Sequence, residues 1–336
     1  MAGDLNERRT IFEVAEAAGV SITTVSHVFS GNRRVREETR RRVLETAERL
    51  AYRPRATAQA LATGRTNTLA LQVSISGESL VLNPFFTSLL ASLSLAAIDR
   101  GFSFVFVPPE NAGRGFTDPL LVERRVDGAI LVDPVRNDPF VRAVVNAGIA
   151  YVSIGRILGI NSDRWVDNDH RAVGEKVVAH LRRAGYKRPA LLTVPFDVSY
   201  IVDCIEGFRS ATADAGRVIE AVDMTEAAAQ RAVGQALQGG EPPDAFFCVH
   251  DRLAVGALAA AAELGVAVPD ELGVVGVGDF LAQHGHPPLT SVRVFPERVG
   301  AIALERLDTL LRGGDAELPG IVPNQLVRRT STARVR

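Results

Sequence analysis

A run of short polar side chains near the N-terminus has the types and spacing needed to bind nucleic acid. The stretch SITTVSHVF places hydroxyl groups and one imidazole between apolar residues that recur at a helical period: Ser21, Thr23, Thr24, Ser26 and His27 between Ile22, Val25, Val28 and Phe29. Short hydroxyl side chains allow close approach to phosphates and bases. His27 can donate a hydrogen bond to a purine acceptor such as guanine N7 or O6. The alternative interpretation is an exposed surface histidine without base contact.

Two helices joined by a tight turn must position this stretch. Thr10 and Glu13 have the spacing of a capping box, and Gly19 is a natural helix end. Ser21 is expected to cap the second helix. A third helix is predicted over residues 36–50, with these side chains turned inward: Val43, Leu44, Ala47 and Leu50. The pattern predicts a helix-turn-helix, and a plain three-helix bundle is the alternative.

The next segment, AYRPRATAQALATGRT, has the composition of a hinge. Pro54 breaks the third helix, and residues 56–62 can form a helix too short to be stable alone. Leu61 has no obvious core to join. It is either one buried leucine in an ordinary linker or a wedge that enters the minor groove when the segment folds on DNA.

Beyond residue 67, apolar strand-like runs alternate with amphipathic helices. Strands are expected at 68–75, 102–107, 128–132, 149–154, 190–194, 245–249 and 273–277. Helices are expected near 84–100, 137–147, 169–184, 201–215, 225–238, 251–264 and 296–312. This alternation predicts an α/β core with doubly wound parallel sheets. Because so many units exceed one comfortable sheet, two lobes are expected, with a ligand cleft at the carboxyl ends of the strands.

Signals for catalysis are weak. The chain has no phosphate-binding loop and no nucleophile elbow, and Gly273, Gly276 and Gly278 stand in the wrong order for a dinucleotide fingerprint. The pair His284 and His286 is either a metal site or, as we favour, two surface imidazoles. The carboxylates Asp167 and Asp169 precede a predicted helix, where acidic caps are expected.

Composition sets the class of the protein. The 336 residues are 46% hydrophobic, which is enough for a large core, and the cysteines Cys204 and Cys248 suggest a reducing compartment without a metal cluster. Neither a secretory signal nor a membrane span is indicated. The net charge of −1 hides an asymmetry, since residues 1–65 carry +4 and the remainder −5. A basic head on an acidic body is consistent with polyanion binding, although a solvated surface would also explain it.

The strings VAEAAGVSITTVSHVFSGNRRVREETRRRV and LAYRPRATAQALATGRTNTLAL resemble the lactose/galactose repressor family of bacterial transcription factors. Segments of the body follow the same family pattern, among them NPFF, RVDGAILV, EGFRSA and PPLTSVR. The resemblance implies an all-α helix-turn-helix headpiece (8–53), a hinge helix (54–66) and a two-lobed core (67–331) similar to periplasmic binding proteins. The N-lobe would hold residues 67–165 and 295–320, and the C-lobe residues 166–294 and 321–331.

The resemblance also assigns roles on DNA. The family's specificity residues match Ile22, Thr23 and His27, and its intercalating leucine matches Leu61. The family's phosphate-positioning residues match Ser21, Thr24, Ser26, Ser30 and Tyr52. His27 resembles the purine-repressor branch, whereas Ala62 replaces a common lysine and so puts one minor-groove contact in doubt.

The effector pocket departs from the family pattern. Cys204 stands where relatives carry a ligand-binding arginine, and Gly278 stands where they carry an aspartate. Pocket positions are otherwise occupied by Phe85, Phe86, Arg156, Tyr200, Met224 and Asp251. Without the charged pair, a free monosaccharide is not expected as the effector. The alternative is that other side chains supply the missing hydrogen bonds.

We therefore expect a sequence-specific DNA-binding regulator, most simply a repressor. It would bind a pseudo-palindromic operator as a cytoplasmic homodimer, with a small effector in the core, no cofactor, no membrane contact and no enzymatic activity. A solute-binding protein and an α/β enzyme are the alternatives. The attached headpiece opposes the first, and the lack of a nucleophile or acid–base constellation opposes the second.

Overall fold

The computed structural model describes residues 10–29, 35–53, 64–74, 83–107 and 119–334. The chain divides into two compact units. One holds the chain up to Thr68 together with Arg125–Asp127, and the other holds Leu69–Arg124 and Gly128–Arg336. We call the helices of the first unit the headpiece and the second unit the core.

Three helices form the headpiece: α1 (Ile11–Ala18), α2 (Ile22–Phe29) and α3 (Glu37–Arg49). The Thr10 N–H donates to Glu13 Oε2 at 2.7 Å, and the Glu13 N–H donates to Thr10 Oγ1 at 3.5 Å, which confirms the capping box. Gly19 ends α1 with a φ of 64°, in the left-handed region. The Thr24 N–H donates to Ser21 Oγ at 3.1 Å, so Ser21 caps α2 as predicted.

The headpiece has its own small core. Its buried apolar side chains are Val14, Ala15, Ala18, Val25, Val28, Val43 and Ala47. The prediction that Leu44 faces inward is wrong, because its side chain is 44% exposed while Thr46 is buried. Successive helical residues are rotated by about 100°, so Ala47 and Leu50 share the face of Val43, whereas Leu44 points away from it.

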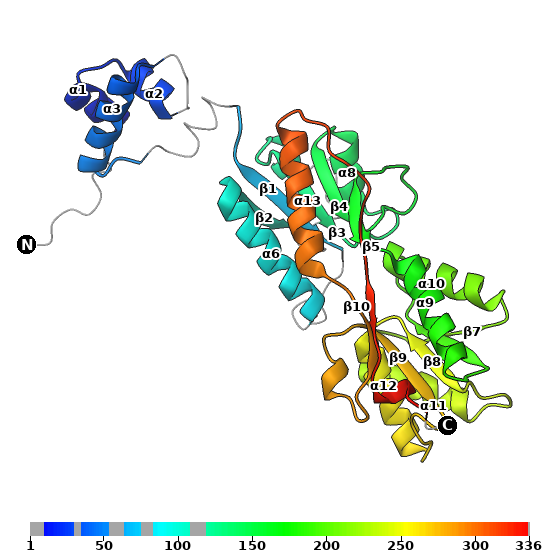
Figure 1. Cartoon of the computed structure of the whole chain (residues 1–336). Helices are drawn as coiled ribbons and strands as arrows, with labels where there is room; N and C mark the ends of the chain where they lie inside the picture. Colours follow the sequence, from blue (N-terminus) through cyan, green and yellow to red (C-terminus); the bar gives the residue numbers. More distant parts are fainter. Residues whose placement is uncertain (1–9, 30–34, 54–63, 75–82, 108–118, 335–336) are drawn as a thin grey trace, which may run out of the picture. The chain divides into compact units, whose positions relative to one another are not determined.

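The first sheet of the core has the strand order β11-β5-β4-β3-β1-β2. The pairs β1–β3, β3–β4, β4–β5 and β5–β11 are parallel. Helices α6 and α13 lie side by side over this sheet (Figure 1). Its elements are β1 (Thr68–Val73), α6 (Pro84–Arg100), β2 (Ser103–Val107), α7 (Pro119–Val122), β3 (Gly128–Val132), α8 (Pro139–Asn146), β4 (Ala150–Ile154), β5 (Trp165–Asn168), α13 (Pro296–Leu311) and β11 (Gly320–Val322).

The second sheet has the order β12-β10-β9-β8-β6-β7. Strands β10 and β12 pair antiparallel, and the other pairs are parallel. Its elements are α9 (His170–Arg183), β6 (Pro189–Thr193), α10 (Ser199–Thr212), β7 (Arg217–Glu220), α11 (Glu226–Leu237), β8 (Ala245–Cys248), α12 (Asp251–Glu263), β9 (Gly273–Gly278), β10 (Thr290–Arg293) and β12 (Gln325–Val327), with 3₁₀ turns at Ala282–His284 and Thr330–Thr332.

The chain crosses between the sheets after β5, β10 and β11. Two of the expected lobe boundaries, at 165/166 and 320/321, fall inside β5 and β11, and both strands belong to the first sheet. Hydrogen bonds tie the crossings together. The Phe295 N–H donates to Asn168 Oδ1 at 3.4 Å, and Asn324 Nδ2 donates to the Asp169 carbonyl at 2.8 Å.

The α9–α10 contact is close enough to require glycine. A Cβ added at Gly207 would lie 2.1 Å from the Arg171 carbonyl oxygen, and one added at Gly174 would lie 2.5 Å from the Phe208 nitrogen. Only residues without a Cβ fit between these two backbones. This contact sets the position of the first turns of α9 and α10, which carry residues of the cleft described below.

Candidate nucleic-acid interface and ligand cleft

Helix α2 presents its polar face to solvent. Val25 and Val28 are buried against α1 and α3, which leaves Ser21, Thr23 and His27 on the accessible side. Ile22 is 41% exposed, although it is a large apolar residue. An isoleucine beside hydroxyl groups at the start of such a helix suits contact with the methyl group of thymine.

A hollow of about 690 Å³ lies beside α2. Ser21, Thr24 and His27 line one side, and Arg36, Thr39 and Arg42 from the start of α3 line the other. Neither Arg36 nor Arg42 forms an ion pair with a described residue. Arg36, Thr39 and Arg42 were not among the predicted DNA contacts, although the arginines at 36 and 40–42 were an available signal.

The structure describes two of the remaining four predicted DNA-binding residues. Ser26 is partly exposed on α2. Tyr52 packs edge-on against Phe29, with ring centroids 5.7 Å apart, so it braces the end of α2. Ser30 and Leu61 lie outside the described residues. Their roles on DNA stay predictions.

Two adjoining cavities, of about 590 and 510 Å³, form a cleft between the two sheets of the core. Residues at the carboxyl ends of strands from both sheets line it, as the alternation of strands and helices predicts for this fold. The first cavity is lined by Val73, Asn83, Phe85, Phe86, Val132, Asp133, Phe196, Tyr200, Met224, His250 and Arg252. The second is lined by Asn83, Phe85, Asp133, Asp167, His170, Tyr200, Val249, His250, Val277, Gly278, Phe280 and Val294.

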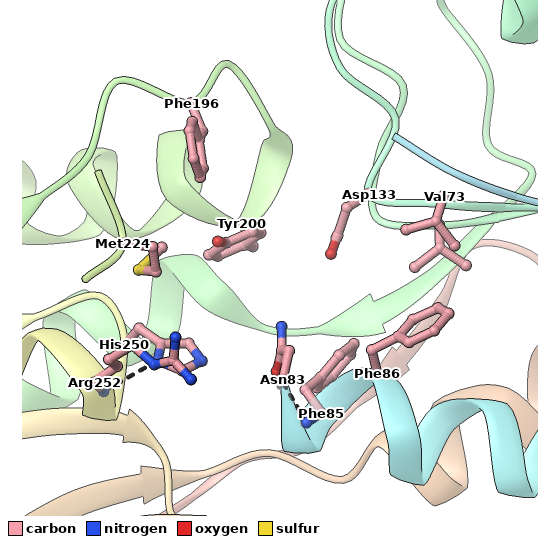
Figure 2. A pocket seen from close by; sticks show the side chains of 11 residues that line it. Val73, Asn83, Phe85, Phe86, Asp133, Phe196, Tyr200, Met224, His250 and Arg252 are labelled. Carbon is pink, nitrogen blue, oxygen red and sulfur yellow. Dashed lines mark hydrogen bonds between the residues drawn. The ribbon is translucent and has the colours of Figure 1, made fainter. Parts of the chain in front are cut away.

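Five of the predicted effector residues line this cleft: Phe85, Phe86, Tyr200, Met224 and Gly278. Figure 2 shows the aromatic rings of Phe85 and Tyr200 on either side of the space into which Asp133 points. Other residues of the cleft were not predicted to bind the effector, among them the ionisable Asp133, His170 and His250. Each follows a strand of the core, and that position was the signal available.

Three predicted effector residues do not line either cavity. Arg156 forms an ion pair with Asp203 of α10, and Cys204 is completely buried. Asp251 is also buried and accepts hydrogen bonds from Ser291 Oγ at 2.6 Å and from the Phe280 N–H at 2.9 Å. Burial raises the pKa of Asp251 to about 6, against the effect of these hydrogen bonds. Asp251 therefore holds the Phe280 wall of the cleft in place.

An acid–base cluster lines the cleft, in which Asp167 and His170 are buried and Asp133 is partly buried. Burial, with a smaller effect of the Asp167 charge, raises the pKa of Asp133 to about 7. His170 Nε2 lies 3.2 Å from Asp167 Oδ1. Burial opposes protonation of His170, but its interactions with Asp167 and, to a smaller degree, with Cys204 outweigh this effect and raise the pKa of His170 well above its usual value.

Some polar atoms of this cluster lack a partner. His170 Nδ1 and Ser199 Oγ are buried without a hydrogen-bond partner among the described residues. His170 lines the second cavity, so a ligand there could bind its ring, whereas Ser199 lines neither cavity. The expectation that Asp167 and Asp169 are both helix caps holds for Asp169, which accepts from the Ala172 N–H at 3.0 Å, whereas Asp167 instead binds His170.

His250 adds a neutral group to the opposite wall. Burial and the nearby Arg252 charge lower its pKa to about 4. Its Nδ1 accepts from the Arg252 N–H at 3.1 Å (Figure 2). The cleft thus offers aromatic surfaces together with carboxylates, imidazoles and a guanidinium group. These groups suit binding of a small molecule with an apolar face and several hydrogen-bonding groups.

Comparison with known proteins identifies the chain. The family model described as bacterial regulatory proteins, lacI family, matches residues 10–55, and the periplasmic binding protein-like domain matches residues 178–332. The HTH-type transcriptional regulator CelR of Thermobifida fusca is 32% identical over 87% of this chain and 89% of its own length. The chain belongs to the lacI family of bacterial regulatory proteins. It is a DNA-binding transcriptional regulator.

Further relatives of this lacI-family regulator agree. The HTH-type transcriptional regulator AscG of Escherichia coli (strain K12) is 30% identical over 96% of this chain and 98% of its own. The solved structure of a transcriptional regulator CelR-cellobiose complex is 30% identical, with a TM-score of 0.73, and the match covers 96% of this chain and all of that one. A lac repressor dimer bound to operator has the same fold, with a TM-score of 0.81 at 24% identity over 98% and 100% of the two chains.

The described part of this lacI-family chain lacks two other features. No group of three or more His, Cys, Asp and Glu residues there is arranged to hold a metal ion. The structure does not describe the side chain of His284, so the prediction about His284 and His286, a metal site or two surface imidazoles, stays a prediction. No described helix is both long and apolar enough to cross a bilayer.

Proposed function

We propose that this regulator is a repressor that binds a pseudo-palindromic operator as a homodimer, with its DNA affinity set by a small metabolite in the core cleft. The observation that carries the proposal is the solvent-accessible polar face of α2. The capped helix α1 and the turn at Gly19 hold this face in position. A helix positioned in this way can enter a major groove with its N-terminal residues against base edges. The proposal also places the regulator in the cytoplasm. It assigns the protein no enzymatic activity and no cofactor.

Base recognition is assigned to Ile22, Thr23 and His27, with Ser21, Thr24 and Ser26 on phosphates. Arg36 and Arg42 beside the same hollow add positive charge where a DNA backbone would pass. Phosphate contacts position the protein, while base contacts discriminate between sequences. Loss of His27 should therefore weaken specific binding by roughly 1–3 kcal/mol, the usual range for one base contact, and spare non-specific binding.

Selection of genomic fragments on the purified protein, followed by electrophoretic shifts, tests this. His27→Ala should lose its preference for the selected sequence, and His286→Ala, an exposed histidine of the core, serves as the matched control. If the protein shows no preference among duplexes, with or without ligands, the regulator proposal fails at its first step.

Dimerisation is assigned to α6 and the neighbouring edge strand β2. Leu89, Leu93 and Ala97 face the core, yet the other side of α6 is also apolar, with Leu95 67% and Ile98 71% exposed. Phe106 on β2 and Val122 on α7 are exposed large hydrophobic residues as well. Apolar surface of this kind is typical of a protein interface. A second copy of this chain would cover it.

Sedimentation tests the dimer. Ile98→Asp should shift the protein to monomer and weaken operator binding, because each half-site would then be bound alone. Val222→Asp changes an equally exposed apolar residue of the second lobe and should remain dimeric. A dimer that survives Ile98→Asp and Leu95→Asp would place the interface elsewhere.

The effector is proposed to be less polar than a free monosaccharide. The aromatic residues Phe85, Phe86, Phe196 and Tyr200 favour a ligand with an apolar face, and Cys204 leaves no arginine in the cleft at that position. Asp133 and His170, which both line the cleft, would bind its polar groups. The solved structure of the CelR relative is a complex with cellobiose. Calorimetry with a panel of sugars and less polar metabolites decides the question, since tight binding of an ordinary hexose would contradict the proposal.

A further inference from the structure

A second hollow of the core is lined by positive charge. It has a volume of about 630 Å³ and lies where β6 and β7 begin, whereas the ligand cleft lies where strands of the same sheet end. Four cations line it: Arg182, Lys187, Arg188 and Arg217. Among its described lining residues, Glu241 alone is acidic. Residues 66–336 as a whole carry a net charge of −5, so the positive charge of this hollow is opposite in sign to that of the core as a whole.

The four cations have no carboxylate partners among the described residues. Arg188 Nε donates to the Pro242 carbonyl at 3.1 Å, and Arg217 Nη1 donates to the Glu241 carbonyl at 3.1 Å. Both partners are neutral, so they orient the guanidinium groups without cancelling their charge. Arginines elsewhere in this lobe behave differently. Arg293 and Arg329, for example, both pair with the buried Asp279 at 2.6 Å.

The backbone around the hollow is fixed. The Lys187 and Arg188 N–H groups both donate to the Asp244 carboxylate at 2.7 Å. This carboxylate holds the loop before β6 and is not among the residues that line the hollow. Small residues also line the hollow, among them Ala190, Ala215 and Gly216, and they leave room between the charges.

Stabilisation of a helix end does not explain the cluster. Arg182 is in the last turn of α9, where a cation favours the helix dipole. Lys187 and Arg188 lie in the following loop, and Arg217 begins β7, so this effect does not apply to them. Three separate segments thus bring exposed cations to one concave surface.

We propose that this hollow binds the phosphate group of a small phosphorylated metabolite, as a second ligand site distinct from the effector cleft. Arginine guanidinium groups match phosphate oxygens with paired hydrogen bonds, and lysine adds a compact point charge. A dianionic group would be held by the four cations together. A neutral sugar would gain none of these interactions. Such a site would allow the regulator to sense the phosphorylated form of a compound independently of the cleft.

Calorimetry on the full chain tests the site at constant ionic strength, with inorganic pyrophosphate and glucose 6-phosphate as probes. We expect saturable binding of one equivalent per chain, weakened at least tenfold in the double variant Lys187→Gln/Arg217→Gln. Arg231→Gln removes an arginine of the same lobe outside the hollow and should bind like the parent. Thermal unfolding of each variant confirms that it is folded.

Two further comparisons identify what is bound and where. Binding of glucose 6-phosphate is compared with binding from a mixture of glucose and inorganic phosphate. This comparison distinguishes recognition of the phosphate ester from recognition of the free ion. The headpiece also carries cations, so Arg36→Gln/Arg42→Gln is measured in parallel. The proposal is overturned if the probes do not saturate, or if binding survives Lys187→Gln/Arg217→Gln and is lost in the headpiece variant.

Discussion

Replacing Asp133 with asparagine should make the core more stable at high pH. Asp133 follows β3 and points into the cleft (Figure 2), where burial and the Asp167 carboxylate raise its pKa from 3.8 to about 7, while His170 acts in the opposite direction. Asparagine has the shape of the protonated carboxyl group and carries no charge at any pH. It therefore removes the cost of ionising Asp133 in a buried place.

Proton linkage gives the sign and size of the change in unfolding free energy with pH. The folded pKa lies above the unfolded one, so between about pH 4 and pH 7 the folded state binds more protons, and stability falls as the pH rises. With pKa values of about 7 and 3.8, the loss between pH 5 and pH 8 is roughly 2 to 3 kcal/mol. His170 acts in a different window. Its raised pKa contributes stability below its unfolded pKa that is lost only as the pH rises through the folded one.

Urea unfolding at pH 5, 6.5 and 8 measures the difference. Trp165 is the single tryptophan and lies in β5 of the first sheet, so its fluorescence reports on the core. The parent should lose about 2 kcal/mol more than Asp133→Asn from pH 5 to pH 8. Asp214→Asn, at an exposed position, should follow the parent. Parallel pH profiles for the parent and Asp133→Asn would refute the buried, raised-pKa interpretation of this carboxyl group.

Other substitutions probe the packing, the headpiece and the hinge. Gly207→Ala places a methyl group 2.1 Å from the Arg171 carbonyl oxygen and should cost about 3 kcal/mol or more in urea unfolding of the core, since backbone cannot move aside cheaply. Thr10→Ala breaks the capping box with Glu13 and should cost the headpiece roughly 1 kcal/mol, measured by hydrogen exchange of α1 amides, while core amides stay unchanged. Leu61→Ala should weaken specific DNA binding much more than non-specific binding in electrophoretic shifts, and equal losses on both DNAs would contradict the wedge role.

Local chemistry made much of this chain predictable from its residues. Caps and helix ends depend on side chains within three or four positions, which is why Thr10, Glu13, Gly19 and Ser21 were interpreted correctly. The long strands and helices of the core have enough residues to show their period. The helix-turn-helix headpiece and the two-lobed α/β core were therefore predictable.

Short elements escaped prediction for a physical reason. Strands β5, β7 and β10–β12 have only three or four residues each, and they exist because a neighbouring strand pairs with them. A pattern of that length has no measurable period. Strand β8 is as short but was predicted, because its run AFFCV is apolar throughout. Two of the lobe boundaries that the resemblance implies also fall inside short strands, β5 and β11.

The chemistry of the sites depends on contacts between distant segments. Asp133, Asp167 and His170 form one cluster because β3 and β5 end at the same edge of one sheet, and nothing local marks Asp133 as an acid with a raised pKa. Arg156 had the right position for the cleft, yet Asp203 on α10 binds it instead. The cations around Arg217 likewise meet only because β6 and β7 pair. Residue types are written in the chain, but desolvation and charge pairing arise only when the folded backbone brings them together.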